Sequence, residues 1–484
     1  MKITQDKKTT FWAVMFPLFL GVFLSSFNTS AINIALPSFM ETFNTSLESV
    51  KWILTGFMLA TGVACPLAGY LGERFSCKKL YLLALIGFTL SSILCSFSFN
   101  IVMLVTFRVM QGIFSGLIIP TTMTIIYQVV SREKQALAVS LWSMASMLAP
   151  ALGPTISGWL VQYYNWKAIF MVNVPIGIIA IILVIYFIPK YNLSNDSSFD
   201  FVGLSAVVVL SLTMLVAFSE GSAWGWTSPQ IIILLTISII SMVIFIRREL
   251  KVSSPALDIR LFKYSKYTIS IIAISIVTMA LYAGTLLTPL YLQNTQHLST
   301  LDTGLILLPP SLVMALMMPI VGTLYSRIDP RIIIGIGICF MALGSWEMSN
   351  LSYNTSHLYI IFWMTVRYIG ISFSTMPITN SGMSIIPKAL SGHASSINNW
   401  IRQVSSSLAI GVFSSLLVMR TAFHTNELGN GVDLIQEKAF TMGINDIYLI
   451  STVIVLIGLP LSFMLRKDKA DKKVTSEEIA SLTN

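Results

Sequence analysis

Long apolar stretches alternate with short polar turns along nearly the whole chain. A helix that crosses the hydrocarbon core of a bilayer needs about 20 apolar residues. Fourteen stretches approach or exceed this length, and each is bounded by charged or turn-forming residues. The pattern predicts membrane-spanning helices at 11–36, 52–72, 80–99, 101–129, 136–161, 168–189, 201–220, 229–247, 268–293, 303–326, 332–350, 357–386, 393–420 and 445–465.

The composition agrees with a chain that lies mostly in lipid. Of the 484 residues, 55% are hydrophobic and only 11% are charged, whereas soluble globular domains carry about 25% charged residues. The composition therefore disfavours both a soluble enzyme and a disordered chain. The first apolar stretch follows Lys7 and Lys8 and is longer than the core of a secretory signal, so we expect a retained helix. The four cysteines fit neither a metal site nor a disulfide framework.

The basic residues indicate how the chain is oriented. An even number of spans places both termini on one side, and lysines and arginines concentrate in cytoplasmic loops. The connections on the terminal side hold 23 of the 30 basic residues, the opposite side holds four, and Arg108, Arg367 and Arg402 lie within spans. Both termini are therefore expected in the cytoplasm. The formal charge of +9 reflects this orientation, and no basic stripe suggests a nucleic-acid partner.

Two parts of the sequence repeat each other. The span at 101–129 contains Arg108 followed by glycines and a proline, and the span at 357–386 contains Arg367 followed by a glycine and a proline. The offset of eight spans pairs the first six helices with the last six and leaves two as an insert. Six-helix halves in parallel relation are typical of secondary transporters, whose substrate site lies between the halves.

We therefore predict an all-α integral membrane protein with 14 transmembrane helices. Residues 1–190 form an N-terminal six-helix bundle and residues 267–466 a C-terminal one. Residues 191–266 supply two linker helices with their connections, and residues 467–484 form a cytoplasmic tail.

Six segments, in this order, resemble those of one transporter family. They are Ala31–Pro37, Gly69–Lys79, Arg108–Gly112, Ala149–Gly158, Trp166–Gly177 and Gly392–Gln403. Together they resemble the major facilitator superfamily, and within it the 14-spanner drug:proton antiporters of the EmrB/QacA type. The resemblance covers the first span through the thirteenth. It implies an exporter whose two six-helix halves rock around a central site.

Two of these segments are conformational motifs in the family. The loop after the second span latches the outward-facing state, and an antiporter motif bends the fifth span. An ordinary charged turn and a plain packing kink are the alternative interpretations. Ser76, Cys77 and Ser157 depart from the family pattern. The residues concerned are Gly69, Gly72, Glu73 and Arg74 in the loop and Gly153, Pro154 and Gly158 in the fifth span.

Arg108 is the most informative candidate for a functional residue. An arginine inside a span is costly unless it faces a polar cavity or a partner, and Asn28 is expected at a similar depth. The alternative is a structural role, in which Arg108 donates hydrogen bonds to backbone carbonyls and so ties helices together. Arg367 repeats the position in the second half. Other polar side chains expected to line the cavity, or else to join helices, are Asn33, Gln111, Asn173, Asn380 and Gln403.

Proton coupling is implied by the resemblance, but the usual acid is absent. Members of the family carry an aspartate at the position of Asn28, and asparagine cannot titrate. Glu220 and Glu347 are the remaining candidates for a proton-linked group, with capping or solvation at the membrane surface as the alternative. Because Arg108 and Arg367 have no deep carboxylate near them, we expect a neutral to positive cavity. Such a cavity prefers anionic or neutral amphiphiles over dications.

The predicted function is a secondary exporter, not an enzyme. We expect a multidrug efflux transporter that moves amphipathic small molecules across the cell membrane in exchange for protons, as a monomer and without a cofactor or metal. Export of an endogenous metabolite or lipid-like anion, with drug resistance incidental, is the alternative. A membrane enzyme is disfavoured because acids and histidines are scattered, and an ATP-driven pump because the sequence has no phosphate-binding loop.

Overall fold

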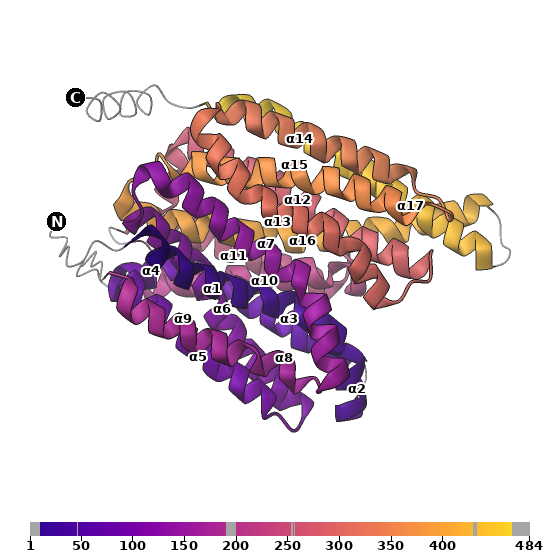
Figure 1. Ribbon diagram of the computed structural model, residues 1–484, viewed down its shortest axis with the longest axis horizontal. Coiled ribbons are helices and arrows are strands. Elements are labelled where there is room, and N and C mark those ends of the chain that lie inside the picture. Colours follow the sequence, from indigo (N-terminus) through magenta and orange to yellow (C-terminus); the bar gives the residue numbers. More distant parts are fainter. Residues whose placement is uncertain are drawn as a thin grey trace.

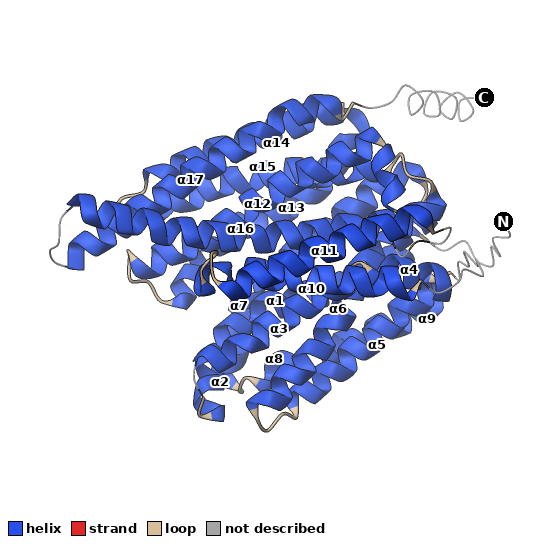
Figure 2. Cartoon of the chain, turned by 180° about the vertical axis from the view of Figure 1, so that it is seen from behind, coloured by secondary structure: helices blue, strands red, loops and turns tan. Residues whose placement is uncertain are grey.

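The computed structural model describes residues 10–45, 47–189, 200–252, 255, 257–428 and 433–466. Every regular element in these ranges is a helix, as Figure 2 shows. The predicted all-α class is therefore confirmed. The predicted tail at 467–484 lies outside the described residues.

The helices follow the order of the predicted spans. The first part of the chain holds α1 (Phe11–Ala31), η1 (Ile32–Ala35), α2 (Leu36–Phe43), α3 (Leu47–Ala64), α4 (Leu67–Phe75), α5 (Cys77–Ser96), α6 (Ile101–Val129), α7 (Arg132–Tyr163), α8 (Lys167–Met171) and α9 (Asn173–Phe187). The insert holds α10 (Phe201–Trp224), α11 (Pro229–Lys251) and η2 (Ile259–Lys263). The last part holds α12 (Ser265–Asn294), α13 (Thr300–Arg327), α14 (Pro330–Glu347), η3 (Met348–Asn350), α15 (His357–Met383), η4 (Lys388–Leu390), α16 (Ser391–Leu428) and α17 (Asp433–Met464).

Twelve helices of the described chain are long and apolar enough to cross a membrane, and thirteen if the bent α7 counts as one span. The segments Arg132–Pro150 and Thr155–Tyr163 of α7 meet at 42°. The predicted span at 52–72 is divided between α3 and α4, because the helix is interrupted at Cys65 and Pro66. By length and composition the predicted count of 14 is thus not confirmed.

The first and last parts of the chain converge at one end of the molecule and diverge at the other (Figure 1). The start of α1 and the end of α17 both lie at the converging end, which we call the terminal end, and the opposite end is the far end. We call α1–α9 the first half and α12–α17 the second half. Between the halves, α13 packs along α7, and α16 packs on α4 and α6.

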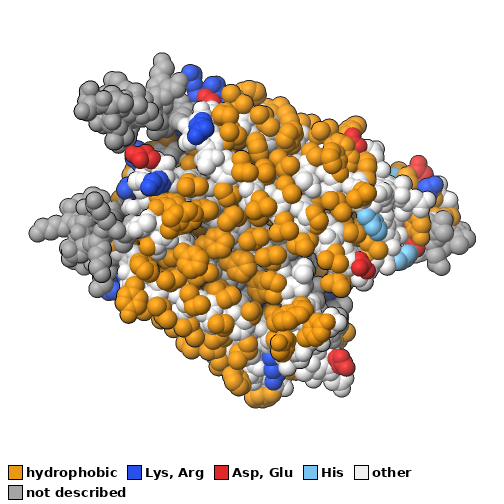
Figure 3. All heavy atoms as spheres, viewed as in Figure 1, with side chains coloured by type: hydrophobic (Ala, Val, Ile, Leu, Met, Phe, Trp, Pro, Cys, Tyr) orange, Lys and Arg blue, Asp and Glu red, His pale blue; other side chains and the backbone are white. Residues whose placement is uncertain are grey.

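Side chains on the outside of the bundle are those of a protein in lipid. Apolar groups cover the middle of the face drawn in Figure 3, and charged groups gather at its ends. The inserted helix α11 exposes Ile232, Ile233, Ile239, Ile240 and Ile244 among others. Such a broad apolar surface fits hydrocarbon and would be a liability in water. The chain is therefore a multi-pass membrane protein.

Glycines allow the closest contacts between helices. In lipid the hydrophobic effect contributes little to helix association, so the helices are held together by close packing of their backbones at small residues. In the second half, α14 and α15 cross at Gly337 and Gly370. A Cβ atom on Gly337 would lie 2.5 Å from Ser374 Oγ and 2.8 Å from the Gly370 carbonyl oxygen. Nearby on the same helix, a Cβ on Gly335 would have only Ser462 Oγ within 4 Å, at 3.8 Å.

We expect Gly337→Ala to destabilise the second half by about 1–3 kcal/mol, because the backbone of α15 would have to move. Gly335→Ala is the matched control and should be neutral or slightly stabilising, since the site has room and alanine favours helix. Thermal denaturation of the two purified variants in detergent measures the difference. Equal midpoints for both variants would contradict the proposed close contact.

Candidate functional site

Arg108 lies at the centre of a polar network inside the first half. Its side chain is 0% exposed and makes hydrogen bonds to three helices. Nε donates to the Ile53 carbonyl at 3.1 Å, and Nη1 donates to Asn28 Oδ1 at 3.2 Å and to Gln111 Oε1 at 2.6 Å. The guanidinium also lies 4.0 Å from the centroid of the Phe57 ring. This geometry is that of a tie between α1, α3 and α6, the alternative that the sequence left open.

The network around Arg108 extends through further polar contacts. Gln111 Nε2 donates to Ser92 Oγ at 2.5 Å, which brings in α5. Asn28 Nδ2 donates to the Leu24 carbonyl at 3.4 Å. Both amide groups are oriented with their oxygens toward the arginine and their nitrogens away from it. No carboxylate of a described residue pairs with Arg108, so its positive charge is solvated by dipoles alone.

Arg367 occupies a similar place in the second half. It is also 0% exposed. Its Nε donates to Ser345 Oγ at 2.9 Å, and Nη2 donates to the Ala280 carbonyl. Nη1 has no hydrogen-bond partner among the described residues and lies beside Gly284 on α12. The two arginines of the sequence repeat thus both join three helices within their own half.

The remaining predicted cavity residues do not form one cluster. Asn380 accepts a hydrogen bond from Tyr127 at 3.0 Å, across the contact between the halves. Asn173, at the start of α9, donates to the Ile169 carbonyl at 3.2 Å and leaves its Oδ1 without a partner. Gln403 is half-buried on α16 and lies against Gly62 of α3. The side chain of Asn33 lies outside the described residues.

At the terminal end the two halves are held together by direct contacts, which we call the terminal-end latch. Ser395 Oγ donates to the Pro120 carbonyl at 2.8 Å, and Lys388 Nζ donates to the Gln128 carbonyl at 3.5 Å. A Cβ on Gly69 would lie 3.0 Å from the carbonyl oxygen of Gly392. The latch therefore depends on backbone meeting backbone where α4 crosses the start of α16.

The predicted conformational residues lie in or near this latch only in part. Gly69 belongs to it, and Gly72 packs near the Cys77 thiol. Arg74 Nη1 donates to the Tyr70 hydroxyl at 3.2 Å. The side chains of Glu73 and Pro154 lie outside the described residues. In α7, Gly153 packs against Ser30 of α1, and Gly158 is half-buried, so this motif belongs to the interior of the first half.

Arg402 on α16 is a third arginine in the membrane interior, and the sequence analysis did not identify it as a site residue. It makes no hydrogen bond or ion pair with any residue that the structure describes. The titratable groups that act on its charge are Tyr282 of α12 and Cys65 at the break between α3 and α4. The sequence did contain a signal that could have identified Arg402, because it is one of only three arginines within the predicted spans.

The burial of α16 shows where space opens between the halves. Residues 391–399 are buried up to Asn399, and residues 400–404 are all half-buried. No residue from 391 to 417 is exposed, so this part of the helix is largely covered by its neighbours. Each residue of the turn 400–404 nevertheless keeps some accessible surface, which we interpret as an internal space that begins directly beyond the latch. Arg402 lies within this turn.

One part of this space is a small cavity of about 120 Å³. It is enclosed by α3, α10 and α16, and its lining mixes apolar and hydroxyl side chains: Thr55, Met58, Leu59, Leu215, Ser219, Ser407 and Ile410. The inserted helix α10 closes this side of the bundle, because Trp400 Nε1 donates to Ser211 Oγ at 2.9 Å and Trp226 Nε1 donates to Ser415 Oγ at 2.7 Å.

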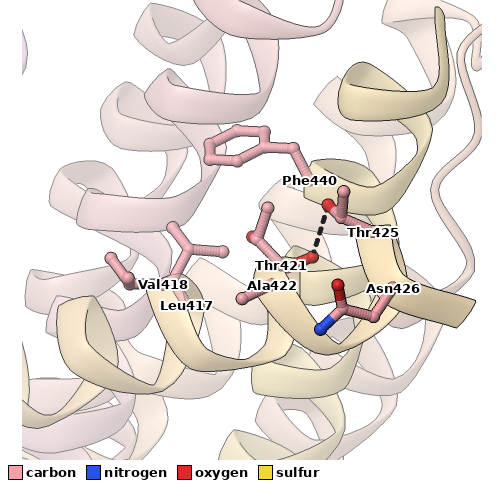
Figure 4. A pocket seen from close by; sticks show the side chains of 7 residues that line it. All are labelled: Leu417, Val418, Thr421, Ala422, Thr425, Asn426 and Phe440. Atoms are coloured by element: carbon pink, nitrogen blue, oxygen red, sulfur yellow. Dashed lines mark hydrogen bonds between the residues drawn. The ribbon is translucent and has the colours of Figure 1, made fainter. Parts of the chain in front are cut away.

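A larger cavity of about 420 Å³ lies at the far end, between α16 and α17 (Figure 4). Its lining includes Leu417, Thr421 and Phe440, and Thr425 Oγ1 donates to the Thr421 carbonyl at 2.8 Å. None of the predicted site residues lines it. Its place outside the contact between the halves makes it a poor candidate for the transport site.

The two acidic candidates for proton coupling differ in their surroundings. Glu347 ends α14, and its Oε2 accepts a hydrogen bond from the Tyr359 hydroxyl at 2.9 Å. Glu220, four residues before the end of α10, is half-buried and has no hydrogen-bond partner among the described residues. Both lie near the far end, and Glu347 follows by two residues Ser345, the hydrogen-bond partner of Arg367.

Residues 18–410 match the Major Facilitator Superfamily. The chain belongs to this family. It is 30% identical to the uncharacterized MFS-type transporter YhcA of Bacillus subtilis (strain 168), over 97% of this chain and 96% of that protein. The predicted kinship with transporters of the EmrB/QacA type is confirmed by two further major-facilitator relatives.

One of these relatives is the lincomycin resistance protein LmrB of Bacillus subtilis (strain 168), which is 26% identical over 95% of this chain and 96% of that protein. The other is the probable multidrug resistance protein EmrY of Escherichia coli (strain K12), 28% identical over 88% of this chain and 83% of that protein. The fold is similar to that of the proton:xylose symporter XylE, with a TM-score of 0.63 and 14% identity over 94% of this chain and 95% of that one.

The Arg108 network yields a prediction for this major-facilitator chain. We expect Arg108→Gln to lower the thermal midpoint, because it removes the hydrogen bonds to Asn28, Gln111 and Ile53. Each buried oxygen left without a donor destabilises the folded state by about 1–3 kcal/mol. Asn28→Asp should raise the midpoint of the otherwise unchanged protein, because a carboxylate 3.2 Å from Nη1 would replace a neutral contact by a charge-assisted one. An unchanged midpoint in Arg108→Gln would contradict the role as a tie.

Proposed function

We propose that this protein is a secondary active exporter that moves amphipathic small molecules out of the cell in exchange for protons. Family membership points to a transporter, and the names of LmrB and EmrY favour drug efflux. The observation that carries the proposal is the combination of a latch at the terminal end with an internal space directly beyond it. A site closed on one side and reached from the other is what alternating access requires.

We further propose that the terminal end is cytoplasmic and that the chain crosses the membrane 14 times. The divided pair α3–α4 and the bent α7 each count as one crossing in this arrangement. An even count agrees with α1 and α17 beginning and ending on the same side, and most basic residues fall on that side. The conformation is then outward-facing, with the latch sealing the cytoplasmic side.

Glu220 is the better of the two proton-linked candidates. An acid that exchanges protons with both sides needs a site that is accessible and not committed to a fixed partner, and Glu220 meets this condition among the described residues. Glu347 is held by Tyr359 and serves better as a junction between α14 and α15. Asn28 contributes a dipole to Arg108 and no proton.

Transport in proteoliposomes tests this function. We expect permanently charged amphiphiles to accumulate when the lumen is acidic and to be released when an uncoupler collapses the pH gradient, with no ATP present. Glu220→Gln should lose gradient-driven accumulation and keep substrate exchange at zero gradient, whereas Glu347→Gln should keep both. Accumulation that ignores the pH gradient would refute proton coupling, and the absence of all transport would refute the exporter.

The latch predicts a second, conformational result. Gly69→Val should slow transport about tenfold or more without preventing folding, because its side chain would meet the backbone of Gly392 and His393 and keep the cytoplasmic side from sealing. Gly392→Ala is the matched control, since the nearest atoms to its Cβ lie 3.5 Å away, and its transport should be close to that of the parent. Equal rates for the two variants would mean that the latch does not form during the cycle.

A further inference from the structure

The interior of the membrane holds positive charge without negative charge. Arg108, Arg367 and Arg402 lie well inside the predicted spans, whereas all 21 acidic residues of the sequence lie at the ends of spans or between them. Unpaired charge in a medium of low dielectric is costly, so a protein keeps it only where a dipole network, water or a ligand compensates it.

The positive charges of two of the three arginines are largely compensated by hydrogen-bond acceptors within the protein. Arg108 donates to a carbonyl and to two amide oxygens, and Arg367 donates to a carbonyl and a hydroxyl. Both are fully buried within their own half and cannot reach a substrate without repacking. Their charges still raise the potential of the space between the halves, because buried charges are only weakly screened.

Arg402 is different in three respects. It has no hydrogen-bond or ion-pair partner among the described residues, it is half-buried where Arg108 and Arg367 are fully buried, and it belongs to the turn of α16 that borders the internal space. Eleven residues separate it from the start of α16, which corresponds to about 16 Å along the helix. That depth is about half the thickness of the hydrocarbon core.

The surroundings of Arg402 come from both halves. Cys65 belongs to the first half and Tyr282 to the second, and neither carries a charge that could neutralise a guanidinium at neutral pH. Five and eight residues further along α16, between one and just over two turns, Ser407 and Ile410 line the small cavity with Met58 and Leu215. Arg402 does not line this cavity itself, but a cation one to two turns from a mixed apolar surface suits an amphipathic anion, whose acid group would reach the arginine while its apolar body extends toward the cavity.

We infer that Arg402 is the anchor for the acidic group of an anionic amphiphile, carboxylate, sulfonate or phosphate, and that this transporter selects anions over cations. The inference rests on the proposed export function and adds a substrate class and the residue that recognises it. A planar guanidinium with free donors can bind such a group by two parallel hydrogen bonds. A cationic amphiphile would instead enter a space that already holds unpaired positive charge.

Two probes with the same fluorophore and opposite charge test the inference. Dansylglycine carries a carboxylate, and dansylaminoethyl-trimethylammonium carries a fixed cation. We expect the parent protein in phosphatidylcholine proteoliposomes to transport the anion at least tenfold faster than the cation. Arg402→Gln should reduce transport of the anion about 10- to 100-fold, the range that follows from losing hydrogen bonds to a charged group, and should not slow the cation.

Two control variants separate recognition from folding. Arg402→Lys keeps the charge and should retain much of the anion transport. Arg420→Gln removes an arginine from the same helix, where it pairs with Asp446 at the far end, and should leave the preference for the anion unchanged. Because Arg402 has no described partner, Arg402→Gln should not lower the thermal midpoint. A lower midpoint with equal loss of both probes would assign Arg402 a structural role and overturn the inference.

The remaining outcomes are distinct. Faster transport of the cation, or unchanged anion transport in Arg402→Gln, overturns the inference and leaves the exporter intact. If the parent moves neither probe, the export function fails and the inference with it. The anion can be a free molecule or a lipid headgroup, so phosphatidylcholine is replaced in part by phosphatidylglycerol. If phosphatidylglycerol raises the KM for dansylglycine in the parent protein but not in Arg402→Gln, the lipid headgroup occupies the same site.

Discussion

The cost of keeping a guanidinium inside a membrane organises each half of this protein. A charged arginine in hydrocarbon must be surrounded by oxygen atoms, and no acid is available nearby. In the first half the oxygens come from Asn28, Ile53 and Gln111, which lie on three helices. In the second half they come from Ser345 and the Ala280 carbonyl, both on helices other than that of Arg367. Each arginine can be satisfied only if its neighbouring helices hold their relative positions, so each half behaves as a unit.

Rigid halves leave the contact between them as the part that can change. That contact uses few side-chain bonds and much close backbone approach, as at Gly69 and Gly392. Small residues make such an interface easy to separate and reform. The inserted helix α10 and the turn that follows it add a lateral wall, because Trp400 of α16 donates to Ser211 of α10 and Trp226, just after α10, donates to Ser415 of α16. A wall of this kind keeps lipid away from the space beside Arg402.

The spans and their order could be predicted from the sequence, because the bilayer imposes a length and requires internal backbone hydrogen bonds. The role of Arg108 could be narrowed to two alternatives but not decided, since the choice depends on which side of α6 meets α1 and α3. Asn380 and Gln403 were grouped with it on polarity alone, yet Asn380 bonds to Tyr127 across the contact between the halves and Gln403 lies against Gly62. Arg402 was overlooked because its importance comes from lacking a partner among the described residues, which is a property of the assembled bundle and not of any local pattern.

Asparagine in place of an acid at position 28, and an arginine at position 402 with no ion-pair partner in the described part of the chain, have the same electrostatic consequence. An aspartate at position 28 would lower the positive potential between the halves and weaken the attraction for an anionic substrate. A cell with a negative interior already drives an anion outward, by about 2.3 kcal/mol per charge for each 100 mV. A proton that enters in exchange moves charge in the same favourable direction. The exporter of an anion thus depends less on a deep titrating acid than the exporter of a cation, whose departure opposes the membrane potential. The replacement of that acid by Asn28 is consistent with the substrate class inferred from Arg402.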